Sequence, residues 1–119
     1  MGTMKEPTSA PAYVGLYPVL CEAARAKGYA LAVHGSVARD FDLIAVPWTD
    51  EAVSAEELIR AIVAAVDFTR DRIVPVDRLF SEPYFADKPH GRKAWSIPLD
   101  CGAVLDVSVT PQLAQPNEE

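Results

Sequence analysis

The sequence predicts an α/β (α+β) fold, a small two-layer sandwich in which a mixed sheet carries its helices on one side. Apolar residues recur at helical spacing within residues 16–27 and 55–66, whereas the apolar runs at 29–35 and 41–48 are too short for helices. Two further extended runs near the end of the chain flank a turn. The predicted order is therefore helix, strand, strand, helix, an irregular stretch and a hairpin.

Length and composition indicate one domain. The chain has 119 residues, half of them apolar, which is enough for a single core. We expect the domain at residues 12–110, between a flexible leader at 1–11 and a flexible tail at 111–119, which are polar and contain prolines. A net charge of −6 argues against non-specific nucleic-acid binding. Because no segment resembles a signal peptide or a membrane helix, we expect a cytoplasmic protein without membrane association.

Both predicted helices have recognisable ends. The first is expected to begin around Pro18, because proline is tolerated in the first helical turn, and Gly28 ends it. Ser54 caps the second helix, with Glu57 at the matching position of a capping box. The apolar face of this second helix is predicted to be buried and comprises Leu58, Ile59, Ile62, Val63 and Val66.

The strands are predicted from short apolar runs. YALAVHG, at 29–35, is bounded by glycines and is interpreted as a buried strand, and FDLIAVPW, at 41–48, forms the next strand. Prolines weaken the signal between 70 and 92, where we expect one extended segment around RIVPV, at 72–76. RKAWSIPL and AVLDVSV, at 92–99 and 103–109, are joined by DCG and predict a hairpin.

Three aspartates within apolar strands are the main candidates for a functional site. Side chains alternate along a strand, so Asp40 and Asp42 share one face, opposite Phe41 and Leu43. Asp106 stands between apolar neighbours in the last strand. If the two strands are adjacent, the three carboxylates meet, and three oxygen donors suit Mg²⁺ together with the oxygens of a triphosphate. The alternative is that these aspartates face water in a turn and on edge strands.

Gly35, Ser36 and Arg39 precede the aspartates and are candidates for nucleotide binding. Glycine lets the backbone approach a phosphate closely, and a serine hydroxyl with nearby N–H groups binds phosphate oxygens. Arg39 would neutralise phosphate charge. His34, directly before Gly35, is interpreted as a hydrogen-bonded structural residue. A basic cluster around residues 88–93 is interpreted as a solvated loop, with contact to a nucleotide or an acidic partner as the alternative.

The segments HGSVAR, DFDLIAV and VLDVSV, at 34–39, 40–46 and 104–109, resemble the motifs of the nucleotidyltransferase superfamily built on the DNA polymerase β fold. In that family a strand ends in Gly-Ser, Asp-x-Asp lies on the next strand, and a third Asp comes from a later strand. The resemblance covers residues 13–109 and implies a minimal nucleotidyltransferase-like protein of bacterial or phage type. It implies that Asp40, Asp42 and Asp106 are catalytic, hold Mg²⁺, and serve transfer of a nucleoside monophosphate from a nucleoside triphosphate.

The spacer between Gly-Ser and Asp-x-Asp is much shorter here than in that family. Only Val37, Ala38 and Arg39 separate the two motifs, as though the middle of the usual segment had been removed. A link of this length is predicted to be a tight turn, because it is too short to complete helical hydrogen bonding. The alternative function is therefore a catalytically inactive protein of this fold that binds a nucleotide or a protein partner, in a regulatory or phage accessory role.

Overall fold

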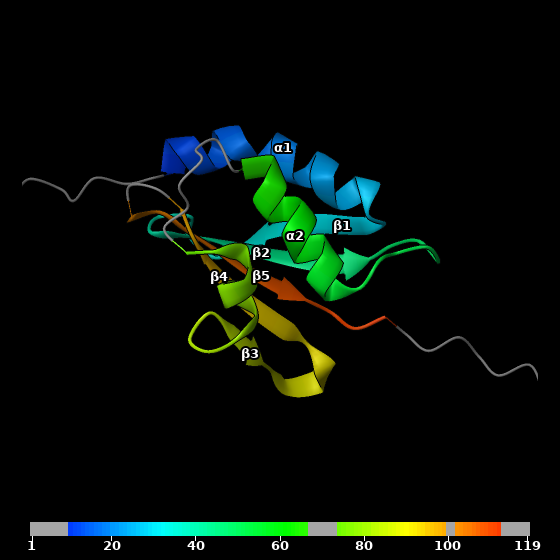
Figure 1. The fold of residues 1–119 in the computed structure, drawn as a ribbon. Helices are drawn as coiled ribbons and strands as arrows, with labels where there is room; N and C mark the ends of the chain where they lie inside the picture. The colour runs from blue at the N-terminus through cyan, green and yellow to red at the C-terminus, as the bar shows by residue number, and fades with distance from the viewer. Residues whose placement is uncertain (1–9, 67–73, 100–101, 113–119) are drawn as a thin grey trace, which may run out of the picture.

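The structure, a computed structural model, describes residues 10–66, 74–99 and 102–112. Within these ranges it combines α-helices with β-strands, and the predicted α+β class is confirmed (Figure 1). In chain order the elements are α1 (Ala10–Ala26), β1 (Tyr29–His34), β2 (Asp40–Pro47), α2 (Ala55–Val66), the 3₁₀ helix η1 (Val76–Phe80), β3 (Phe85–Asp87), the 3₁₀ helix η2 (Pro89–Gly91), β4 (Lys93–Pro98) and β5 (Val104–Val109).

The strands form one mixed sheet in the order β1-β2-β5-β4-β3. β2 and β5 run parallel, whereas the other neighbouring strands run antiparallel. β4 and β5 form the predicted hairpin. Asp42 of β2 is the direct register partner of Asp106 of β5. The prediction that the two aspartate-bearing strands are neighbours is therefore confirmed.

The sheet has one covered face and one open face. α1 and α2 lie together on the same side of the sheet (Figure 1). On that side the side chains of Phe41, Leu43 and Ala45 are buried, as are Leu105 and Val107 of the neighbouring strand. The even-numbered residues of β2 and β5 point the other way and are exposed or half-buried. We call this second side the open face, and it carries all three predicted aspartates.

The helix α2 begins and packs as the sequence predicts. The Ser54 hydroxyl accepts a hydrogen bond of 3.2 Å from the Glu57 backbone N–H, which satisfies one of the free donors of the first turn. The five residues predicted for its apolar face are the ones that are buried. Their burial anchors the helix across the covered face of the sheet.

The helix α1 differs from its prediction, because it begins at Ala10 and contains Pro18. Proline removes the hydrogen bond to the carbonyl four residues earlier, which belongs to Val14. Val14 is 66% exposed, so water can solvate that carbonyl. Tyr13 holds the early part of the helix in place: its buried ring stacks on Phe41 with the centroids 5.1 Å apart. Residues 10 and 11, expected in the leader, thus belong to the helix, while residues 1–9 and 113–119 lie outside the described ranges.

Three further expectations need correction. β1, interpreted as a buried strand, lies at the edge of the sheet and is largely exposed. The segment expected to be extended around 72–76 begins outside the described residues, and Val76 opens η1 instead. The irregular stretch also contains β3, a strand of three residues that extends the sheet beyond β4. Propensity alone does not reveal a strand this short, since its pairing with β4 defines it.

Candidate acidic site on the open face

The candidate site lies where β2 and β5 run side by side on the open face. Asp42 and Asp106 are register partners on parallel strands, so their Cα atoms are about 4.7–4.9 Å apart. Asp40 stands two residues before Asp42 and therefore on the same face. The side chains of Asp42 and Asp106 are half-buried, and Asp40 is exposed. The sheet thus brings the three predicted aspartates to one area of the surface.

Asp40 and Asp106 form a carboxyl pair. Partial desolvation, a hydrogen bond with Asp106 and repulsion from the Asp106 carboxylate together raise the pKa of Asp40, while the Arg39 guanidinium opposes the shift. Asp106 also accepts a hydrogen bond of 2.8 Å from the hydroxyl of Ser96 on β4.

The third carboxylate, that of Asp42, lies against Gly35. Gly35 has a φ of +82°, and a Cβ added to it would come within 2.5 Å of the Asp42 Oδ2 atom. Glycine is therefore required at this position for two reasons, the backbone conformation and the close approach of the carboxylate. The described residues contain no group of three His, Cys, Asp or Glu side chains placed to hold a metal ion. The arrangement is thus a pair, Asp40 with Asp106, and a neighbouring carboxylate.

The loop between Gly35 and Asp40 contains no helix, which confirms that part of the prediction. The Ser36 hydroxyl accepts a hydrogen bond of 3.4 Å from the backbone N–H of Ala38. Val37 has a φ of +62°, a left-handed conformation that β-branched residues rarely adopt. The predicted phosphate-binding residues therefore lie beside the carboxylates, but without the aligned N–H groups and dipole of a helix N-terminus.

Tyr13 joins this loop to both aspartate-bearing strands. Its hydroxyl donates a hydrogen bond of 2.7 Å to the Arg39 carbonyl and accepts one of 2.9 Å from the backbone N–H of Val104. Val104 is the register partner of Asp40. One buried side chain from α1 therefore fixes the relative position of the two strand ends that carry the carboxyl pair.

The donor set of the carboxyl pair fits Mg²⁺. This ion prefers oxygen ligands, and proteins usually hold it through one or two carboxylates while substrate phosphates and water complete its octahedron. Asp40 and Asp106 would be the protein ligands, and Asp42 lies on the same face, with its carboxylate against Gly35. A bound divalent cation would supply positive charge that offsets the repulsion between these carboxylates.

Sequence reasoning missed Ser96 and interpreted His34 as a structural residue only. The sequence DCG at 100–102 predicts a hairpin centred on residue 101, and in such a hairpin residue 96 stands opposite residue 106. That symmetry is a signal from which the Ser96–Asp106 contact follows. His34 is the register partner of Asp42, so the open face carries a polar row from β1 to β4, which comprises His34, Asp42, Asp106 and Ser96.

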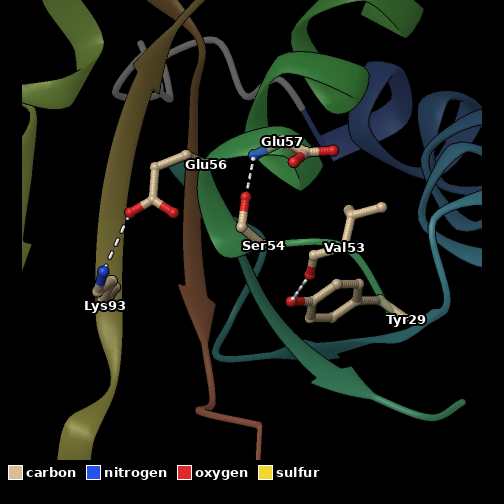
Figure 2. A network of polar contacts seen from close by, with 6 residues as sticks. All are labelled: Tyr29, Val53, Ser54, Glu56, Glu57 and Lys93. Atoms are coloured by element: carbon tan, nitrogen blue, oxygen red, sulfur yellow. Dashed lines mark hydrogen bonds and ion pairs between the residues drawn. The ribbon is translucent and has the colours of Figure 1, made fainter. Parts of the chain in front are cut away.

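A second polar network, at the start of α2, has a structural role (Figure 2). Glu56 pairs with Lys93 at 3.0 Å, and this hydrogen bond lowers the pKa of Glu56. The Tyr29 hydroxyl donates a hydrogen bond of 2.6 Å to the Val53 carbonyl. These groups satisfy one another and tie the helix to β1 and β4, so this network offers no free functional group.

In comparisons with protein-family models, with curated proteins and with solved structures, no significant match to this chain was found. Among the described residues, no helix has the length and apolar character needed to span a membrane.

Proposed function

We propose that this protein is a minimal nucleotidyltransferase-like protein whose open face binds Mg²⁺ and a nucleoside triphosphate. The observation that carries the proposal is the pairing of Asp42 with Asp106 in register, with Asp40 two residues before Asp42 on the same face of β2. Two unrelated stretches of sequence, far apart in the chain, supply these carboxylates to one surface. Carboxylates this close repel one another, and a bound cation would relieve the repulsion. Their placement therefore favours a cation site over a purely structural role.

In this proposal each residue of the site has a distinct role. Asp40 and Asp106 hold the ion, and Ser96 orients Asp106 through its hydrogen bond of 2.8 Å. The backbone at Gly35 and Ser36 faces the phosphates, and Arg39 contributes positive charge beside Asp40. A cytoplasmic location would give the protein access to both nucleoside triphosphates and Mg²⁺.

The loop geometry supports a second candidate, a protein of this fold that binds a nucleotide or a protein partner without catalysing transfer. Val37–Arg39 form no helix, so a bound triphosphate would lack several N–H contacts. Each charge-assisted hydrogen bond contributes roughly 1.5–3 kcal/mol, so the loss of two weakens binding by about two to four orders of magnitude. Slow transfer, or binding alone, is the consequence.

Incubation with each α-³²P-labelled nucleoside triphosphate, Mg²⁺ and a cell lysate separates the two candidates. Transfer predicts a labelled acceptor, which disappears with Asp106→Asn and persists with Asp50→Asn, a change at an exposed loop carboxylate outside the site. If the wild-type protein labels nothing but still binds a triphosphate in the presence of Mg²⁺, the second candidate is correct. If labelling is unaffected by Asp106→Asn, the acidic site is not the origin of the activity.

A further inference from the structure

A groove runs along the open face beside the candidate site. It has a volume of about 350 Å³ and lies over β5, β4 and β3. Its lining includes Asp106 and Ser96 from the acidic site, so the groove is continuous with the proposed metal-binding carboxylates. It therefore occupies the position into which a second substrate would extend from the site.

The two ends of the groove carry opposite charges. Asp106 and Ser96 lie at one end, and Lys88 lies at the other. Lys88 follows Ala86 by two residues in extended backbone, so by strand alternation its side chain projects on the same face. The described residues place no carboxylate in ion-pair contact with Lys88, in contrast to Lys93, which is paired with Glu56.

The register gives the length of the groove. Ala86 pairs with Ala94, and Ser96 lies two residues from Ala94 in the direction away from Lys88. Lys88 and Ser96 are therefore separated by about four strand residues, or roughly 13 Å between Cα atoms. After allowance for the lysine side chain, a ligand of about 7–10 Å spans the two ends.

Small side chains make the groove. Ala86, Ala94 and Ser108 are neighbours across three strands and leave space above the sheet. Tyr84 adds an aromatic side chain to the lining, and the Arg78 guanidinium lies 5.7 Å from its ring centroid. The lining thus combines hydroxyl groups, aromatic residues and the ammonium group of Lys88, which suits a polar molecule with an apolar edge.

We propose that this groove is the acceptor subsite and that it takes a sugar phosphate, with the phosphomonoester at Lys88 and a hydroxyl group at Ser96 and Asp106. The assignment of the acceptor rests on the proposed nucleotidyl transfer. In that step the acceptor oxygen forms a bond to the α-phosphorus and the bond from this phosphorus to the bridging oxygen breaks. Pyrophosphate leaves with the electron pair, and the hydroxyl proton passes to Asp106. A phosphomonoester is favoured over a carboxylate because its near-double charge pairs better with a single ammonium group.

Amide chemical shifts of the ¹⁵N-labelled protein test the subsite without nucleotide or metal, with glucose 6-phosphate as the probe. We expect saturable shifts at Ala94, Ser96 and Ser108 below about 10 mM probe, and much weaker shifts with glucose, inorganic phosphate or glucuronate. Lys88→Gln should weaken binding about tenfold or more, whereas the matched change Lys27→Gln, at an exposed lysine outside the groove, should leave it unchanged. Equal binding to Lys88→Gln, or no shift at the groove amides, overturns the proposal.

Triphosphate binding with Mg²⁺, measured separately, keeps the two proposals distinguishable. A protein that binds the triphosphate but not glucose 6-phosphate refutes the sugar-phosphate subsite alone. A protein that binds glucose 6-phosphate but no triphosphate retains the groove as a sugar-phosphate site and refutes its role as an acceptor subsite, together with the proposed transfer. Ala94→Leu, which fills the groove from β4, should abolish probe binding while triphosphate binding persists.

Discussion

The contact between Gly35 and Asp42 leads to a prediction that needs no ligand. Gly35→Ala places an L-residue at a φ of +82°, which costs about 1–2 kcal/mol, less roughly 0.4–1 kcal/mol for the reduced freedom of the unfolded chain. The new Cβ also comes within 2.5 Å of Asp42 Oδ2, and the carboxylate must rotate away at a cost of about 0.5–1.5 kcal/mol. We therefore expect a total destabilisation of about 0.5–3 kcal/mol in urea unfolding.

Gly102 is a matched control for the backbone part of this cost. Its φ is +79°, and a Cβ there would meet no atom within 4 Å. Gly102→Ala therefore destabilises the protein only through the unfavourable backbone conformation. Gly35→Ala should therefore lower the unfolding free energy more than Gly102→Ala does. This difference should vanish when Asp42→Ala is also present, because substitutions at contacting residues are energetically coupled and those at distant residues are not. If Gly35→Ala costs the same in both backgrounds, the carboxylate does not lie against Gly35 and the described geometry is wrong.

Three further predictions concern stability. The raised pKa of Asp40 contributes stability that is present below its unfolded pKa and is lost as pH rises through the folded pKa. In metal-free buffer Asp40→Asn should therefore gain unfolding free energy relative to wild type between acidic and neutral pH, and a constant difference would argue against the pair with Asp106. Val37→Gly should be more stable than Val37→Ala by about 0.5–1 kcal/mol in urea unfolding, because of the φ of +62°, and the opposite order would refute the left-handed conformation. Ser54→Ala should lower the thermal unfolding free energy by about 1 kcal/mol through loss of the cap on Glu57, and an unchanged melting temperature would mean that this bond is not made.

Local patterns predicted the parts of the fold in which local and tertiary preferences agree. The alternation of FDLIAVPW assigned the faces of β2, and the capping box with its apolar stripe placed α2. The turn at 100–102 predicted the hairpin that carries Asp106. Even the adjacency of β2 and β5 followed from the repeated pattern of one acid between apolar residues.

The remaining features depend on contacts between distant residues. Proline propensity placed the start of α1 at Pro18, but Tyr13, buried against Phe41, extends the helix to Ala10. The strand β3 is defined by its pairing with β4, and no local sequence pattern predicts this pairing. Within the site, the rotation of the Asp42 carboxylate toward Gly35 depends on the path of the loop that follows Gly35. Sequence therefore predicted that the two aspartate-bearing strands are neighbours, but not how the carboxyl groups are arranged on the open face.

Isothermal titration calorimetry with nucleoside triphosphates, in Mg²⁺ and in EDTA, tests the central claim most directly. We expect saturable binding of at least one triphosphate that requires Mg²⁺, is lost with Asp106→Asn, and persists with the surface change Asp50→Asn. Absence of binding for all four nucleoside triphosphates, or binding that is indifferent to both Mg²⁺ and Asp106→Asn, would contradict the assignment of the open face as a metal-dependent nucleotide site.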